Sequence, residues 1–128
     1  MGQQQLLLIV LGVIIVGVAV VVGIQMFTSS AEESNIDQTS NELLRIVARA
    51  QQHYQKPTAM GGGGKSFGTG ASAFVIPATI DTTESAFYSI SANNAQSITF
   101  IATCRTATGV TIQAVGYPTT NTMVVNRP

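Results

Sequence analysis

The sequence predicts an α+β fold: a long N-terminal α-helix packed on a small antiparallel β-meander of four or five strands. Three observations predict it. An apolar run, broken only by Gln25, extends from Leu6 to Phe27, an apolar stripe of helical period follows it, and the C-terminal half alternates short apolar segments with polar breaks. We expect the helix to form the stem of a lollipop-shaped molecule whose head is the sheet.

The apolar run contains no charge, and the first charged residue of the chain is Glu32. Its length is about the roughly 20 residues that a helix needs to cross a bilayer's hydrocarbon. A signal peptide would carry a basic n-region and a shorter apolar stretch of about 7 to 15 residues. The run is instead preceded by Met1, Gly2, Gln3, Gln4 and Gln5, with no Lys or Arg. Residues 1–30 are therefore predicted to be an apolar helix that spans a membrane and belongs to the working protein.

Three glycines, Gly12, Gly17 and Gly23, lie within this predicted span. A single span can satisfy its backbone in lipid only as a helix, and small residues let neighbouring helices approach closely. Their spacings of five and six residues differ from the four of a GxxxG motif, so a simple paired interface is not indicated. Glycine is also common in membrane anchors, and that plainer interpretation stays open.

Residues 31–56 are predicted to continue the helix in amphipathic form. The apolar positions recur at separations of seven, four, three and four, which places them on one helical face, and they are Ile36, Leu43, Val47, Ala50 and Tyr54. We expect this face to pack on the sheet. A helix from about residue 2 to 55 would be roughly 80 Å long, with a weak point between residues 28 and 34. The alternative is a new helix that Thr28, Ser29 and Ser30 cap.

Lys56 and Pro57 are predicted to end the helix, because a residue before proline is disfavoured in the α region. Residues 57–72 are rich in glycine and predict a flexible loop. The remaining residues, 73–128, predict the antiparallel head domain. Its expected strands are 73–79, 87–92, 97–104, 110–116 and 122–126.

Several kinds of chemistry are excluded or disfavoured by composition. Six basic residues balance six acidic ones, so no nucleic-acid partner is indicated. Ala59–Ser66 matches a relaxed phosphate-binding loop, but it follows a helix and a proline rather than a strand. Cys104 is the only cysteine, which rules out an intramolecular disulfide and a cysteine-built metal site, and the only histidine, His53, lacks partners as a metal ligand. We expect no catalytic, cofactor-binding or metal-binding residues, no small-molecule substrate and no enzymatic activity.

An uncharged apolar helix that turns amphipathic, a glycine-rich loop and an antiparallel meander together resemble a type IV pilin over the whole chain. The resemblance is architectural, with a motif-like start at MGQQQLLLIVLG. It implies export as a prepilin, cleavage of a short leader by a prepilin peptidase, and N-terminal methylation. It further implies storage in the inner membrane and assembly by pilus machinery into a filament whose core is built of these helices.

The resemblance places the assembly residues at the N-terminus. Met1 would be the mature, methylated residue after a leader; alternatively Gly2 ends the leader and Gln3 is first. The family usually has glutamate at mature position five, where this chain has Gln5, so an amide replaces a charge and membrane storage becomes cheaper. Many pilins also have a C-terminal disulfide loop, which a single cysteine cannot form.

Other classes of protein stay open on sequence alone. A minor pilin or a pseudopilin of a secretion or DNA-uptake machine has the same features as a major pilin. An archaeal-type filament subunit or a flagellin-like assembly protein would have an apolar N-terminal helix of the same kind. A monomeric binding domain with a single membrane anchor is the alternative from another class.

Overall fold

The computed structural model describes residues 2–68 and 73–128, and its fold is α+β as the sequence predicts. One helix, α1 (Gly2–Gln55), precedes a short 3-10 helix, η1 (Thr58–Met60), and four strands. The chain divides into two compact units, residues 1–33 and residues 34–128, and α1 contributes to both. The helix is unbroken between residues 28 and 34, where the sequence suggested a weak point.

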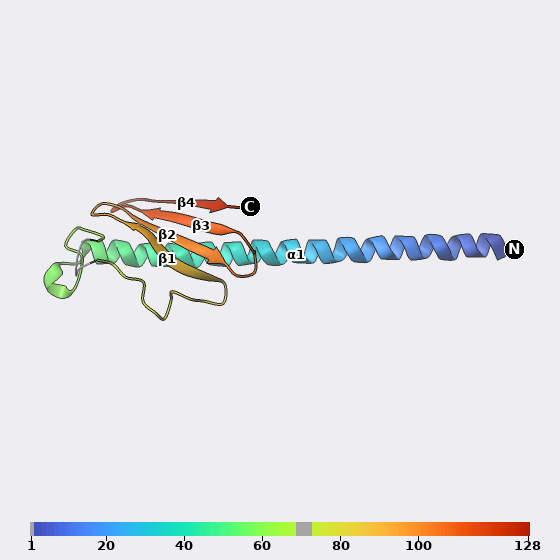
Figure 1. Ribbon diagram of the computed structural model, residues 1–128, viewed down its shortest axis with the longest axis horizontal. Helices are drawn as coiled ribbons and strands as arrows, with labels where there is room; N and C mark the ends of the chain where they lie inside the picture. Colours follow the sequence, from blue (N-terminus) through green and yellow to red (C-terminus); the bar gives the residue numbers. More distant parts are fainter. Residues whose placement is uncertain (1, 69–72) are drawn as a thin grey trace. The chain divides into compact units, whose positions relative to one another are not determined.

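Four strands form one antiparallel sheet in the order β1-β2-β3-β4. Their bounds are Ala86–Asn93 for β1, Ile98–Cys104 for β2, Thr111–Gly116 for β3 and Asn121–Asn126 for β4. Each strand pairs with its neighbour in sequence, so the sheet is the predicted meander, with β1 and β4 at its two edges (Figure 1).

The predicted strand at 73–79 is wrong: this segment joins no ladder among the described residues. Pro77 explains the difference, because proline lacks the N–H that a ladder requires. The Pro77 carbonyl instead accepts from the amides of Ile80 and Asp81, which makes a turn. Phe74 in the same segment is buried and packs edge-on against Phe100 of β2, with ring centroids 5.9 Å apart. The apolar residue Phe74 of this segment thus packs into the core without forming part of a strand.

The core of residues 34–128 lies between α1 and one face of the sheet. Burial alternates along β2 and β3, because successive side chains of a strand point to opposite faces. Fully buried side chains from the sheet include Ile98, Phe100 and Ile112, and they meet Leu43 and Val47 of α1 in one cluster. At about 25 cal/mol per Å² of apolar area, such burial is the main stabilising term of this unit.

Candidate functional site

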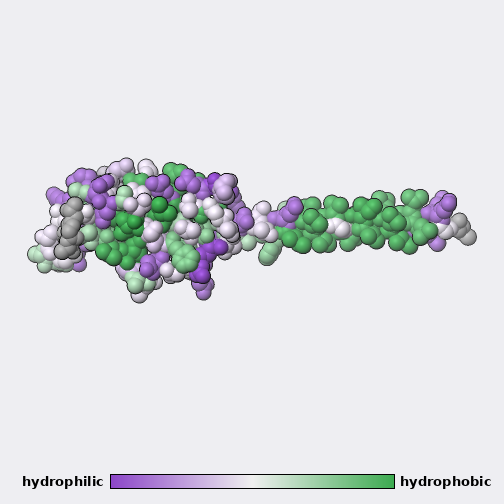
Figure 2. All heavy atoms as spheres, viewed as in Figure 1, coloured by the Kyte–Doolittle hydropathy of each residue, from purple (hydrophilic) through white to green (hydrophobic). Residues whose placement is uncertain are grey.

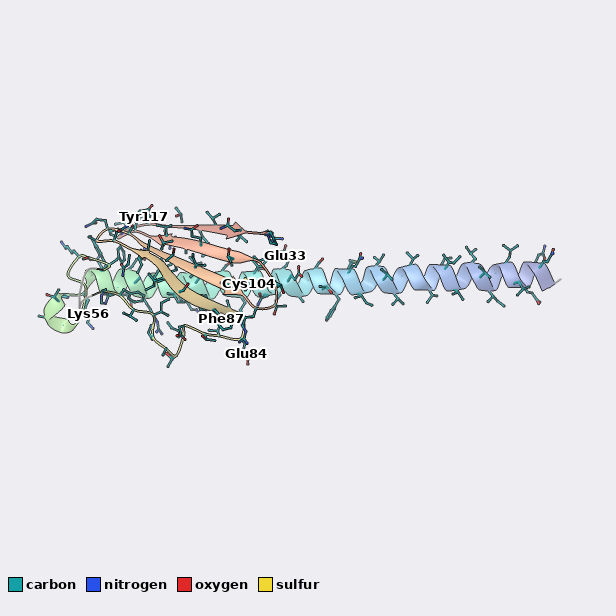
Figure 3. The ribbon with its side chains drawn as sticks, in the orientation of Figure 1. Glu33, Lys56, Glu84, Phe87, Cys104 and Tyr117 are labelled. Carbon is teal, nitrogen blue, oxygen red and sulfur yellow. The ribbon has the colours of Figure 1, made fainter. Side chains whose placement is uncertain are left out.

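The first unit consists of helix alone, and its apolar side chains are exposed on every side. Between Leu6 and Phe27 no described side chain is buried, and the large apolar residues are 47–79% exposed. The space-filling view shows apolar side chains covering this part of α1 (Figure 2), and they project into open space in Figure 3. A helix that is apolar all round is stable only inside lipid or among other apolar segments. α1 is long and apolar enough to cross a membrane.

The glycines at positions 12, 17 and 23 of this unit leave open space beside the helix. A Cβ atom added at Gly12, Gly17 or Gly23 would find no neighbouring atom within 4 Å. Internal packing therefore does not explain glycine at these positions. At 3.6 residues per turn, Gly12 and Gly23 lie on about the same helical face, whereas Gly17 lies about 140° around the axis. Two separate faces of α1 thus allow a close approach by another helix.

The N-terminal end of α1 carries the predicted assembly glutamines. Gly2, Gln3, Gln4 and Gln5 are all helical and exposed, and the three amide side chains make no hydrogen bond within the described part of the chain. Met1, the remaining predicted assembly residue, lies outside the described residues. At the other end of the apolar span, the Thr28 hydroxyl donates to the Ile24 carbonyl at 3.0 Å, which satisfies it without any external partner.

The amphipathic part of α1 presents the predicted stripe to the core. Ile36, Leu43, Val47, Ala50 and Tyr54 are all at most 8% exposed. Sequence periodicity alone did not single out Ile46, Asn35 or Thr39, which are also buried. Asn35 donates to the Ser85 carbonyl at 3.0 Å and accepts from the Ala107 amide at 3.4 Å. It therefore joins two loops of the head domain to α1.

The glycine-rich loop closes the C-terminal end of α1. The amides of Gly63, Gly64 and Lys65 donate to the carbonyls of His53, Lys56 and Tyr54 at 2.8, 3.0 and 2.8 Å. The last carbonyls of a helix have no partner within the helix, so these bonds satisfy them. A sequence of glycines predicts only a loop, and this capping role could not have been found from the sequence.

Close packing explains why glycine is needed in that loop. Gly62 and Gly63 are buried. A Cβ at Gly62 would collide with the Lys56 carbonyl oxygen, and one at Gly63 with the Ser66 carbonyl oxygen. Backbone atoms cannot yield as a flexible side chain can, so any larger residue must shift the loop.

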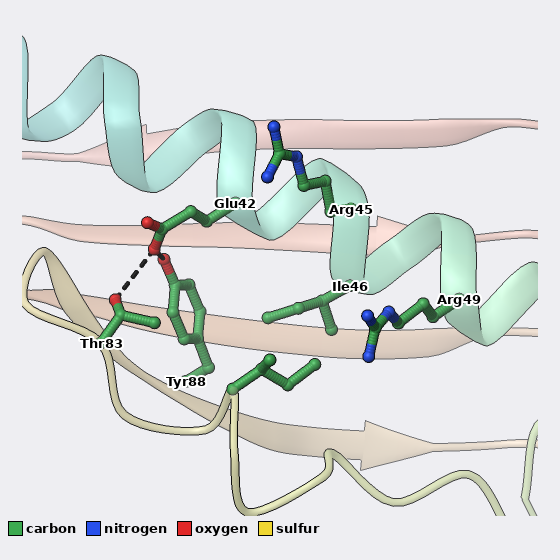
Figure 4. Close-up of a pocket in the computed structure, with 7 residues that line it drawn as sticks. Glu42, Arg45, Ile46, Arg49, Thr83 and Tyr88 are labelled. Carbon is green, nitrogen blue, oxygen red and sulfur yellow. Dashed lines mark hydrogen bonds between the residues drawn. The ribbon is translucent and has the colours of Figure 1, made fainter.

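A polar cluster lies where α1 meets the segment before β1. One oxygen of Glu42, Oε2, accepts from the hydroxyls of Thr83 at 2.9 Å and Tyr88 (Figure 4). It also accepts from the Ser85 hydroxyl at 2.6 Å. The other oxygen, Oε1, accepts from the Gln38 amide at 3.4 Å. Hydrogen bonds to an ionised group are roughly twice as strong as neutral ones. The cluster was not predicted, because its members lie far apart in the sequence.

Two residues of this cluster, Glu42 and Tyr88, have shifted pKa values. Burial by itself raises the pKa of Glu42, but the hydrogen bonds from Ser85, Tyr88, Thr83 and Gln38 outweigh it and hold the pKa below its ordinary 4.5. Burial, and then donation to the Glu42 carboxylate, raise the pKa of Tyr88 from 10.0 to about 12. At neutral pH, the cluster is a carboxylate surrounded by neutral hydroxyl donors.

A small cavity of about 210 Å³ opens beside the cluster. Its walls are apolar at Ile46, Ile80 and the Tyr88 ring, and Arg45 and Arg49 lie at its rim (Figure 4). Sites for drug-sized ligands begin at about 300 Å³. This cavity is smaller, and Glu42 within it is engaged by its hydroxyl donors.

Cys104 and His53 lie apart from this cavity. Cys104 is buried at the end of β2, and His53 packs on Phe74 with ring centroids 5.6 Å apart. Within residues 2–68 and 73–128, no three His, Cys, Asp or Glu side chains gather closely enough to hold a metal ion.

Comparisons with protein-family models, with curated proteins and with solved structures give no match.

Proposed function

We propose that the chain is a structural subunit of a type IV pilus-like filament and polymerises with copies of itself through the apolar part of α1. One observation carries the proposal. From Leu6 to Phe27 the large apolar side chains of the helix are 47–79% exposed and lie on all its sides, so this part of the helix requires an external apolar environment. Lipid supplies that environment before assembly, and a bundle of identical helices supplies it afterwards.

The proposed transfer from lipid to filament gains little hydrophobic free energy, because one apolar environment replaces another. Close packing and hydrogen bonds must then supply the driving force. Two features of α1 support this. Its glycines leave room on two faces, and its terminal glutamine amides, which make no hydrogen bond among the described residues, can bond with a neighbouring subunit. A neutral Gln5 replaces the charge that pilins usually have, so we propose amide hydrogen bonding rather than charge neutralisation at this position.

The proposed location is the inner membrane before assembly and the cell surface afterwards, with a prepilin peptidase and pilus assembly machinery as partners. The proposed role is structural rather than enzymatic. N-terminal methylation is part of the same proposal.

The test is to purify filaments from the cell surface and to determine the mass and N-terminal sequence of their subunit. We expect this chain as the repeating component, and an image reconstruction in which residues 2–27 line the filament axis. Recovery of the chain only as monomers from detergent-solubilised membranes, with no filaments, would contradict the proposal.

A second candidate function is a monomeric binding domain on a single membrane anchor. The observation that favours it is the division of the chain at residues 33 and 34. It leaves the sheet and the part of α1 packed on it, residues 34–128 and from here on called the head domain, with their own core. Substitutions of Gly12 and Gly23 distinguish the two functions, because only a packed filament core would reject larger side chains there. A minor pilin or pseudopilin is distinguished from a major subunit by its low abundance in the purified filament.

A further inference from the structure

Strand β4, at one edge of the sheet, is exposed to solvent along its whole length. All its residues are exposed except the partly exposed Met123, although the strand contains Met123, Val124 and Val125 in succession. Val124 is 55% exposed on the outer face, and Val125 is 38% exposed on the face that carries the core. β4 thus presents apolar side chains to solvent on both faces of the sheet.

The backbone groups at its free edge can be assigned from the turn that precedes it. The Tyr117 amide donates to the Thr120 carbonyl, and hydrogen-bonded pairs alternate along an antiparallel ladder. The pairs that bond β3 to β4 are therefore Val115–Thr122, Gln113–Val124 and Thr111–Asn126. It follows that Asn121, Met123 and Val125 direct their N–H and C=O groups away from β3.

The opposite edge of the sheet is protected, whereas no segment of residues 2–68 or 73–128 bonds to the outer edge of β4. The backbone of residues 81–83 covers the start of β1, where the Tyr88 amide donates to the Asp81 carbonyl at 2.8 Å. A register irregularity between Ile90 and Ala92 interrupts the rest of β1. Covering segments and bulges are devices that prevent edge-to-edge pairing. β4 has no irregularity in its register with β3, no proline and no charge within Asn121–Asn126.

A second copy of β4 fits this edge. In an antiparallel pair with its two-fold axis at Met123, residue 121 lies opposite residue 125 of the second copy, and Met123 lies opposite itself. This register uses the free backbone groups of all three edge residues and keeps the core face of each sheet on the same side. It also places Thr122 opposite Val124, a favourable pair of β-branched side chains. The nearest charge, Arg127, falls opposite the neutral Thr119, so no like charges meet.

We propose that β4 is a self-association strand, which joins two copies of the chain into one continuous antiparallel sheet across a two-fold axis at Met123. This contact goes beyond the filament role. A two-fold contact between head domains links subunits side by side, and between neighbouring filaments it would produce lateral bundling. It requires no contact between the apolar helices.

The first test changes the sign of the charges that would face each other across the two-fold axis. It uses the chain with its apolar helix, purified in detergent. Asn121→Lys with Val125→Lys places like charges opposite each other, whereas Asn121→Glu with Val125→Lys places opposite charges there. Within one copy these residues are four positions apart, so both variants should fold with the same circular dichroism and thermal midpoint. We expect the Lys/Lys variant to weaken dimer formation by about tenfold relative to the Glu/Lys variant in analytical ultracentrifugation. Equal association of the two variants would overturn the proposal.

The second test maps the register by disulfide formation, with Cys104→Ala as the background. A hydrogen-bonded pair has Cα atoms about 5.5 Å apart, within the disulfide range of about 4.4–6.8 Å. Met123→Cys should therefore link to itself under mild oxidation. Thr122→Cys should link to Val124→Cys when the two variants are mixed. Ser89→Cys on the exposed face of β1 is the control, and an equal yield from it would contradict the assigned axis.

Both tests are separate from the filament proposal. The paired variants share an unchanged α1, so any association through the apolar helix contributes equally to both. Loss of filaments in cells would leave the β4 dimer measurable in detergent, and loss of the β4 dimer would leave polymerisation through α1 intact.

Discussion

Glu42 connects helix α1 to the segment before β1 through hydroxyl donors rather than through an arginine. Arg45 and Arg49 lie one and two turns away along the same helix, yet neither makes a hydrogen bond or an ion pair within the described residues. Thr83, Ser85 and Tyr88 instead direct their hydroxyls at one carboxylate oxygen. The stability of the head domain should therefore depend on the protonation of Glu42 and Tyr88.

The stability of the head domain should fall at both ends of the pH scale. The folded pKa of Glu42 lies below 4.5, so its stabilisation is present above that pH and is lost as the pH falls through the folded value. The pKa of Tyr88 is raised from 10.0 to about 12, so its stabilisation is present below pH 10.0 and is lost as the pH rises towards 12. Urea unfolding followed by circular dichroism across this range measures both limbs.

Glu42→Gln should remove the acid limb and cost about 1–2 kcal/mol at neutral pH, because three hydroxyls lose an ionised acceptor. Glu84→Gln, at an exposed carboxylate, is the matched control and should leave the curve unchanged. An acid limb that persists in Glu42→Gln would show that another carboxylate causes it.

Gly63→Ala should destabilise the head domain by about 1–3 kcal/mol, since the added Cβ meets the Ser66 carbonyl oxygen and the loop must shift. That shift also weakens the bond from the Gly63 amide to the His53 carbonyl. Met60→Ala, at an exposed position of η1, should change stability by no more than about 0.5 kcal/mol. Denaturant midpoints measure both variants, and equal values would mean that the loop does not hold the helix end.

The sequence predicted which residues of α1 are buried, because the helical period of its apolar residues indicates the buried face. All five residues of the predicted stripe are buried, because helix geometry fixes which side chains share a face. The Glu42 cluster and the cap at Gly63 were not predictable. Each depends on a contact between segments that only the tertiary fold brings together, and neither leaves a local pattern.

At the scale of elements, α1 combines two helices of different character in one continuous structure. Its first part is apolar on all faces, and its second part buries one stripe against the sheet. Its bounds were predictable because Pro57 ends it and no helix breaker other than glycine interrupts it. The segment at 73–79 was misassigned because Phe74, Val75 and Ile76 suggest a strand, whereas Pro77 removes the N–H needed for pairing.

Gly12→Leu and Gly23→Leu should each abolish or strongly reduce filament formation, because both fill the same face of α1 where a neighbouring helix can approach. A Cβ added at either position faces open space among the described residues, so the fold of the subunit itself should be unaffected. Electron microscopy of the cell surface, with immunoblots of the membrane fraction, separates failed assembly from failed expression.

Val13→Leu is the control for these glycine variants, since it adds one methylene group at an exposed apolar position without filling a glycine gap. It should assemble normally. Wild-type filaments from the Gly12→Leu and Gly23→Leu variants would favour a simple membrane anchor, in which glycine is merely tolerated.

At the scale of the whole molecule, the two units differ in what they need for stability. Residues 34–128 contain one continuous hydrophobic cluster, formed by α1 and the sheet together. Residues 2–33 contain no buried side chain among those described. The head domain should therefore fold in water without the apolar helix, whereas the apolar helix should depend on lipid, detergent or other copies.

A fragment comprising residues 30–128 tests this division. We expect it to be soluble, to unfold in a single cooperative transition, and to form no filaments. The full-length chain should polymerise when detergent is removed, because its exposed apolar helices then have only one another to contact. Light scattering and negative-stain microscopy of both samples distinguish ordered filaments from amorphous aggregates. If the fragment formed the same filaments, polymerisation would lie in the head domain, and the apolar helix would be an anchor alone.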